Sequence, residues 1–187
     1  SRVFVSTLWL LGSRADGKFV VVEKTPEKMN VREPERDTLV SANHFQTTGL
    51  EADKRNQRYI EEATSIPRYT RMTELLAGAG GKITPPRAVE ILRDRKLPGG
   101  RFAGNGQRAS LNPFIATHST VMDLTDGIFW AASPPHQLGK FVAFDVNDFD
   151  RELPDLTIGA DETLASGEFE KARGARNRPP LKYLRCV

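Results

Sequence analysis

The sequence has a single cysteine among its 187 residues, which excludes an internal disulfide and a cysteine-pair metal site. It has no apolar run long enough to span a bilayer, and its first residues show no signal-peptide layout. The one cysteine, Cys186, precedes the last residue. A chain end is not expected to supply the base and the electropositive, enclosed surroundings that activate a thiol. We therefore interpret Cys186 as incidental to function.

A concentrated basic segment is also missing. The net charge is +3 and the pI is near 9.1, but acidic and basic residues alternate, as in residues 32–37. Nucleic-acid surfaces need Lys and Arg clustered on one face, so no nucleic-acid partner is predicted. With 39% hydrophobic and 27% charged residues, the composition is that of an ordinary globular protein without repeats or low-complexity tracts.

The first part of the chain predicts strands. A near-continuous apolar run over residues 3–11 indicates a strand covered on both faces. Asp16-Gly17 is typical of a tight turn, so residues 19–23 are expected to return as a second strand. A third strand is expected at residues 30–32. Another short apolar run then leads into Ser41-Ala42-Asn43-His44-Phe45.

The middle of the chain predicts helices. Residues 51–63 are charged, and both an exposed helix and an ordered loop fit them. Ser65 is expected to cap a helix with Pro67 in its first turn, and Thr84 is expected to cap the next one. The polar, glycine-rich segment 101–112 reads as a loop.

The last part returns to strands. Residues 114–123, 128–132 and 140–145 are expected to form an antiparallel meander, followed by a short helix at 161–173 and an extended tail at Pro179-Pro180. Strands, then helices, then strands indicate an α+β fold, with helices against or between antiparallel sheets. Trp9 and Trp130 are expected in the core.

Asn43 is the first candidate for chemistry, because it follows a predicted strand end. An asparagine there can present an amide N–H to a developing negative charge; the alternative is an Asx turn that ends the strand. His44 is interpreted as a packed or capping residue, His118 as a core or interface residue and His136 as exposed. These three histidines are far apart in sequence and predict no metal site.

Several segments together resemble one family. They are Ser41-Ala42-Asn43-His44-Phe45, Ser65-Ile66-Pro67-Arg68-Tyr69, Ile91-Leu92-Arg93-Asp94, and a closing hairpin. The hairpin runs over residues 117–123 and 130–132 and then Lys140-Phe141-Val142-Ala143-Phe144-Asp145. From about residue 4 to residue 149 the chain resembles the C45-type acyl-coenzyme A:6-aminopenicillanic acid acyltransferases, which are related to choloylglycine hydrolases.

The resemblance implies a four-layer αββα N-terminal-nucleophile (Ntn) hydrolase fold. In such enzymes a precursor cleaves itself to expose a cysteine, which attacks an amide or thioester carbonyl and forms an acyl-enzyme. Asn43 matches an asparagine that holds the oxyanion, and Arg68 matches an arginine near the nucleophile. His44, Phe45 and Tyr69 are the predicted substrate-binding residues. No cofactor and no metal are predicted.

The nucleophilic cysteine of this pattern is not in the sequence. We expect residues 1–150 to be the C-terminal portion of the Ntn-hydrolase-like domain and residues 151–187 to be a C-terminal extension. An upstream segment of the same precursor would carry the nucleophile. Ser1 has the chemistry to be that nucleophile, but the strand after it aligns well downstream of the family's nucleophile.

The expected partner is therefore a small acyl or amide substrate, with hydrolysis and acyl transfer both open. The alternative function is a non-catalytic binding or assembly module that keeps the fold.

Overall fold

The computed structural model describes residues 6–81, 83–164 and 167–176; for residues 136 and 173–176 it describes the backbone alone. Ser1, Cys186 and the Pro179-Pro180 tail lie outside the described residues. The chain divides into two compact units. The first contains the described residues up to 81 together with the turn Leu124–Asp126, and the second contains the rest.

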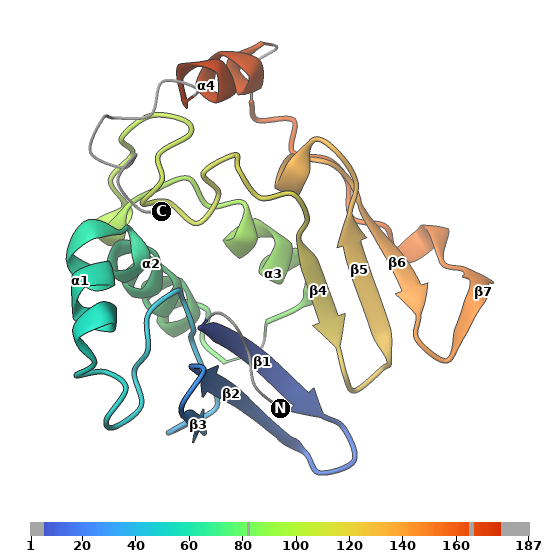
Figure 1. The fold of residues 1–187 in the computed structure, drawn as a ribbon. Helices are drawn as coiled ribbons and strands as arrows, with labels where there is room; N and C mark the ends of the chain where they lie inside the picture. The colour runs from blue at the N-terminus through green and yellow to red at the C-terminus, as the bar shows by residue number, and fades with distance from the viewer. Residues whose placement is uncertain (1–5, 82, 165–166, 177–187) are drawn as a thin grey trace. The chain divides into compact units, whose positions relative to one another are not determined.

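The first unit begins with the predicted hairpin. Strands β1 (Thr7–Ser13), β2 (Lys18–Lys24) and β3 (Met29–Arg32) form an antiparallel sheet in the order β1-β2-β3 (Figure 1). The turn after β1 ends at Gly17, whose φ of 61° is a left-handed conformation that glycine adopts without strain. The Asp-Gly turn and the existence of three strands are thus confirmed. The first strand runs over Thr7–Ser13 rather than residues 3–11, of which residues 3–5 lie outside the described part of the chain.

The first strand is not covered on both faces, contrary to the sequence prediction. Leu10 is 64% exposed and Trp9 41%, so the expectation of a core Trp9 was also wrong. The buried residues of this sheet come from β2, where Val21 is 0% and Val22 9% exposed. Among the described strands, β1 pairs with β2 alone, at the edge of the sheet. The burial of a strand depends on what packs on it and not on its own apolar content.

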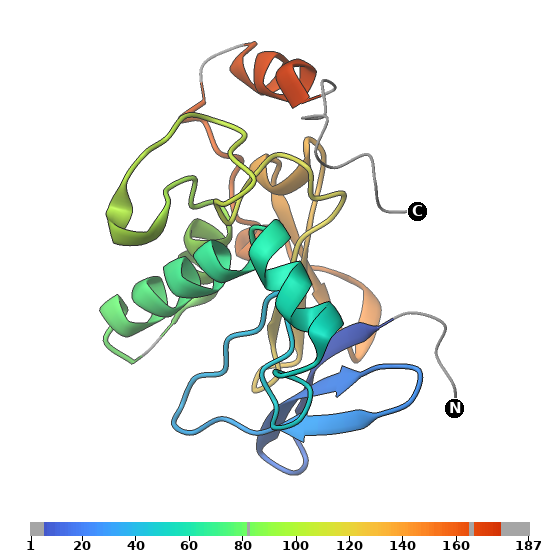
Figure 2. The ribbon, with the colours of Figure 1, turned by 60° about the vertical axis from the view of Figure 1, so that its left-hand side comes forward.

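Two helices complete the first unit. α1 (Lys54–Glu62) and α2 (Ser65–Gly78) run in clearly different directions, joined by a tight bend (Figure 2). Residues 51–63 are thus mostly helical, with Asp53 as the N-cap. The N-cap of α2 is Thr64, not Ser65 as predicted. Ser65 is instead the first helical residue, and its fully buried hydroxyl bonds the loop at Asn43 and His44.

The second unit places a helix against an antiparallel sheet. Its sheet has the order β4-β5-β6-β7. The elements are α3 (Pro85–Leu92), β4 (Thr120–Asp123), β5 (Ile128–Ala132), β6 (Phe141–Asp145), β7 (Asp148–Glu152) and α4 (Glu168–Arg176), with 3-10 turns at Pro98–Gly100, His136–Leu138 and Pro154–Leu156. α3 lies beside β4 (Figure 1).

The core of the second unit forms where α3 meets this sheet. Val89 of α3 packs with Trp130, Phe141 and Ala143, all nearly or fully buried. The prediction of a core Trp130 is therefore confirmed, and its indole Nε1 donates to the carbonyl of Leu156 over 2.8 Å. The predicted cap of α3 is confirmed too, since the Thr84 hydroxyl accepts from the backbone N–H of Arg87.

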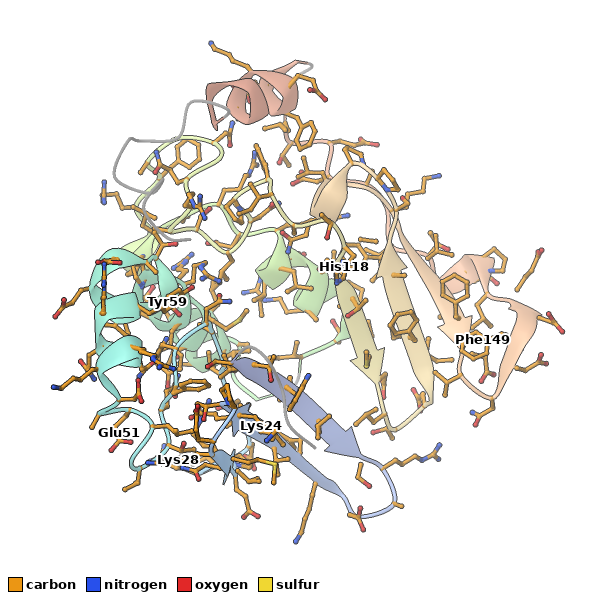
Figure 3. The ribbon with its side chains drawn as sticks, viewed as in Figure 1. Lys24, Lys28, Glu51, Tyr59, His118 and Phe149 are labelled. Atoms are coloured by element: carbon orange, nitrogen blue, oxygen red, sulfur yellow. The ribbon has the colours of Figure 1, made fainter. Side chains whose placement is uncertain are left out.

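The second unit differs from the sequence prediction in three places. The strand predicted from residue 114 begins only at Thr120, because Phe114 has a φ of 61°, which no strand residue adopts. β7 was not predicted, since its five residues are exposed and mostly charged; Phe149 on it is 68% exposed (Figure 3). His118 precedes β4 and its side chain is exposed, so it is not a core residue; its alternative role at an interface stays a prediction (Figure 3).

The predicted helix at 161–173 also begins later, at Glu168. The side chain of His136 lies outside the described part of the structure. Helices together with two antiparallel sheets make the fold α+β; the four-layer Ntn arrangement stays a prediction. Among the described residues, no helix combines the length and the apolar character needed to cross a membrane.

Candidate active site

Asn43 lies in an irregular loop of the first unit and is held from two sides. Its backbone N–H donates to the Ser65 hydroxyl over 2.8 Å. Its side-chain Oδ1 accepts from Arg68 Nη2 over 2.6 Å. Arg68 also donates from Nε to the carbonyl of Thr64, at 3.2 Å. The first turn of α2 therefore positions both the backbone and the side chain of Asn43.

The bond to Arg68 fixes the orientation of the Asn43 amide. A guanidinium has donors only, so the amide atom that faces it must be the oxygen and not the nitrogen. The Nδ2 group is then turned away from Arg68, and no described residue bonds it. Asn43 thus presents two N–H donors to an acceptor from outside, which is the property that an oxyanion-binding asparagine requires.

His44 is buried next to Asn43, with 5% of its surface exposed. Its Nδ1 lies 2.8 Å from the Ser65 hydroxyl and its Nε2 3.1 Å from Gln46 Nε2. Burial is the main cause that lowers the pKa of His44; the nearby Arg32 and Arg68 lower it further, while Glu23 opposes them. This supports the interpretation of His44 as a packed, neutral residue.

The next loop residue, Phe45, is bonded through its backbone on both sides. Its N–H donates to Asn56 Oδ1 over 2.8 Å, and its carbonyl accepts from Asn56 Nδ2 over 3.0 Å. Asn56 lies in α1, is 6% exposed, and also bonds the carbonyl of Glu51, which precedes that helix (Figure 3). One side chain therefore completes the backbone hydrogen bonds of a segment that has no regular structure.

Glu23 on β2 binds the end of the same loop. Its carboxylate is fully buried and accepts from the backbone N–H groups of Gln46 and Thr47, each at 3.0 Å, and from the Thr47 hydroxyl at 2.7 Å. Arg32 Nε on β3 lies 3.7 Å from this carboxylate. Sequence reasoning did not single out Glu23 or Asn56, because their partners are distant along the chain.

A cleft of about 900 Å³ opens beside this loop within the first unit. Its lining combines apolar side chains with amide, hydroxyl and charged groups, and Tyr59 of α1 is among them (Figure 3). The lining comprises residues 6–10, Thr25, Glu27, residues 39–43, Phe45, Asp53, Arg55, Asn56, Tyr59, Arg68, Met72 and Leu76.

Of the five residues that the sequence suggested, Asn43, Phe45 and Arg68 line this cleft. His44 and Tyr69 do not form its wall; their rings meet edge to face, with centroids 5.5 Å apart. The structure therefore brings all five into one neighbourhood. Their roles in catalysis and substrate binding remain predictions.

The described residues offer no metal centre. No group of three or more His, Cys, Asp or Glu side chains within residues 6–81, 83–164 and 167–176 is arranged to hold an ion. The polar groups that line the cleft are amides, hydroxyls, two arginines and the carboxylates of Glu27 and Asp53, so the cleft offers both donors and acceptors.

Comparison with known proteins gives one family. The model of the family acyl-coenzyme A:6-aminopenicillanic acid acyl-transferase matches residues 6–101, which include Asn43, Arg68 and every residue that lines the cleft. The hairpin at residues 117–145 lies beyond this match. No curated protein and no solved structure matches the chain. Because the matched residues make up more than half of its length, the chain belongs to the acyl-coenzyme A:6-aminopenicillanic acid acyl-transferase family.

Proposed function

We propose that this chain supplies the oxyanion-binding and positioning groups of an N-terminal-nucleophile amidase or acyltransferase. Membership of the acyltransferase family indicates the general class of activity. The observation that supports the mechanism is the pair of Asn43 and Arg68 at the cleft, in which the arginine occupies the amide oxygen and leaves the amide nitrogen as donor.

In the proposed reaction, a cysteine thiolate attacks the carbonyl of an amide or thioester, and the cysteine's own α-amine takes the thiol proton. Asn43 Nδ2 donates to the carbonyl oxygen as it becomes an oxyanion, where a preoriented donor is most effective. Collapse of the tetrahedral intermediate breaks the bond from carbon to nitrogen or sulfur, and the α-ammonium gives its proton to the departing amine or thiol. An acyl-enzyme remains. Water or an acceptor amine then releases the acyl group.

Arg68 has two functions in this proposal. Its bond to Oδ1 holds the Asn43 amide in the orientation that exposes Nδ2. Its permanent positive charge favours a nearby thiolate over the thiol. The nucleophile is proposed to come from an upstream segment of the same precursor. Phe45 contributes to the cleft wall, and His44 and Tyr69 support the loop beside it.

The test compares the 187-residue chain with the precursor that contains the upstream segment. The processed precursor is expected to release leaving group from acyl amide or acyl thioester substrates in a burst, followed by slower turnover. The 187-residue chain by itself is expected to show neither the burst nor labelling by a cysteine-directed acyl probe. A burst from the chain alone would contradict the proposal, and a processed precursor that binds ligands without any turnover would favour the binding-module alternative.

A further inference from the structure

The loop that carries Asn43 is bonded on both sides of this residue by two neighbouring strands. Residues 40–48 have no regular secondary structure, so side chains must meet their backbone hydrogen-bonding needs. Three side chains that bond this loop come from β2 and β3: Glu23, Asn30 and Arg32. Glu23 and Asn30 are directly opposite in the antiparallel register. Arg32, two residues after Asn30, lies on the same face of the sheet.

The carboxylate of Glu23 holds the C-terminal side of the loop. All of its hydrogen-bonding partners within the loop are donors: the N–H of Gln46, the N–H of Thr47 and the Thr47 hydroxyl. The Thr47 hydroxyl donates to Glu23, because a carboxylate can only accept, and it accepts from Asn30 Nδ2 at 3.2 Å. Asn30 Nδ2 also donates to the carbonyl of Thr48, at 3.1 Å.

Arg32 holds the N-terminal side of the loop. Its Nη2 donates to the carbonyl of Val40 over 2.7 Å. Its Nε faces Glu23 Oε1 at 3.7 Å, which is an ion pair but too long for a hydrogen bond. The side chain of Arg32 is 19% exposed and that of Glu23 0%, so water screens the pair little.

A fully buried carboxylate is costly unless donors and a cation compensate it. Here the compensation comes from the loop itself and from the arginine that bonds the loop's other side. If residues 40–47 move, Glu23 and Arg32 therefore lose their hydrogen-bonding partners in the loop. If either side chain is substituted, the loop loses hydrogen bonds that hold it in place. Asn43 lies between the two points of attachment, Val40 and Gln46.

We propose that Glu23 and Arg32 are positioning residues for the Asn43 amide: together they fix both sides of its loop and so aim its Nδ2 into the cleft. This inference rests on the proposed function for its catalytic consequence. It goes beyond that function by assigning a role to two residues of a sheet whose side chains neither line the cleft nor touch Asn43. The bond of Asn43 N–H to Ser65 depends on this placement as well.

The first test measures amide hydrogen exchange by NMR in the processed full-length protein and needs no substrate. Glu23→Gln keeps the shape of the side chain but replaces one acceptor oxygen with an NH2 group. In place of either oxygen this group faces the N–H of Gln46, which donates to both, and the substitution also removes the negative charge opposite Arg32. We expect exchange to rise at least tenfold at Asn43 as well as at Gln46 and Thr47. An increase confined to Gln46 and Thr47, with Asn43 unchanged, would overturn the proposal.

Arg32→Lys tests the other side of the loop, because a single ammonium cannot face Glu23 and bond the Val40 carbonyl in the way that the guanidinium does. It is expected to raise exchange at Asn43 to a similar extent. The control is Val89→Ala, which removes a fully buried side chain from the core of the second unit. This variant should lower the melting temperature without raising exchange at Asn43.

The second test measures turnover. Glu23→Gln and Arg32→Lys should lower kcat at least tenfold with KM near that of the wild type, while Val89→Ala keeps its kcat at a temperature where it is folded. Equal kcat in all four proteins would overturn the positioning role. An inactive wild type would instead contradict the proposed function, and the exchange measurement would still decide whether the pair positions Asn43. If Glu23→Gln does not fold, Arg32→Lys and Glu23→Asp carry both measurements.

Discussion

Asn43 and Arg68 are 25 residues apart in sequence, and a 2.6 Å hydrogen bond joins their side chains. At the scale of single residues, this bond decides which end of the amide is available. The oxygen is occupied by a donor-only group, so the nitrogen is left for an acceptor in the cleft. The oxyanion-binding role proposed for Asn43 depends on this orientation, because only the amide nitrogen can donate to an anion.

Under the proposed function, Asn43→Ala in the full-length protein should lower kcat by about 10²–10³, equivalent to roughly 3–4 kcal/mol of barrier. KM should stay near the wild-type value, because the donor acts as charge develops in the transition state. Steady-state kinetics measure both constants. Asn43→Asp is the matched variant: it keeps an oxygen for Arg68 but cannot donate, so it should lose as much kcat. A large loss of stability with full turnover of the folded fraction would instead indicate a structural Asx turn.

Arg68→Lys should lower kcat by about 10- to 100-fold, because a hydrogen bond to a charged group contributes about 1.5–3 kcal/mol and lysine replaces a fork by one point charge. The guanidinium bonds Asn43 and Thr64 at once, which an ammonium at that distance does not reproduce. Arg58→Lys is the control, since the side chain of Arg58 on α1 is exposed and pairs with Glu62. An active Arg68→Lys enzyme with an unchanged pH profile would contradict the assignment.

The burial of His44 gives the protein an expected pH dependence of stability. Its pKa in the folded protein is lowered, chiefly by burial, from an unfolded value of about 6.5. The unfolded chain therefore binds the proton more readily, and stability is full above about pH 6.5 and falls as pH drops through the folded pKa. Melting curves between pH 5 and 8 should show this fall, and His44→Asn should flatten it. The exposed His118→Asn is the control and should keep the wild-type slope.

At the scale of elements, the helices α1 and α2 act as supports for the loop between β3 and α1. Each contributes one buried polar side chain near its start: Asn56 from α1 and Ser65 from α2. Neither side chain caps its own helix. Both instead bond the backbone of residues 43–45, which a strand or helix would have bonded internally.

Asn56→Ala should destabilise the protein by about 1–3 kcal/mol, since the buried N–H of Phe45 loses its acceptor. Urea denaturation measures this free energy of unfolding. Gln57→Ala is the matched control one residue further along α1; its side chain is exposed, so it should change stability by less than about 0.5 kcal/mol. If both substitutions lowered the free energy of unfolding equally, the hydrogen bonds between Asn56 and Phe45 would not be the cause of the loss.

At the scale of the whole molecule, the two units have separate cores. The first has β2 at its centre, and the second has β5 and β6 beneath α3. All residues of the candidate site and the cleft belong to the first unit. In the second unit, Arg93 holds the segment between β5 and β6 by donating to the backbone carbonyls of Gln137 and Gly139.

Phe141→Ala should lower the stability of the second unit by about 3–5 kcal/mol, because the ring is fully buried and its removal leaves a cavity. Urea denaturation monitored by tryptophan fluorescence measures this change, since Trp130 packs in the same core. Phe149→Ala is the control; Phe149 is 68% exposed, so its removal should be nearly neutral. A small effect of Phe141→Ala would mean that this core does not hold the sheet together.

The sequence by itself determined the features that depend on neighbouring residues. The Asp16-Gly17 turn, the Thr84 cap with its prolines and the first three strands follow from local conformational preferences, and they form as predicted. The family was also evident from short motifs, including those around Asn43 and Arg68. These features need no knowledge of what lies across the fold.

Only the tertiary structure decided the rest, because the decisive partners are distant along the chain. Glu23 reaches Thr47 across 24 residues, and Ser65 reaches Asn43 across 22. No local pattern indicates that a strand glutamate is buried or that a helix serine binds a loop. Likewise, the exposure of Trp9 and the left-handed Phe114 depend on what packs around them. The motif marked Asn43 as a candidate, and packing between separate elements fixed the direction of its amide.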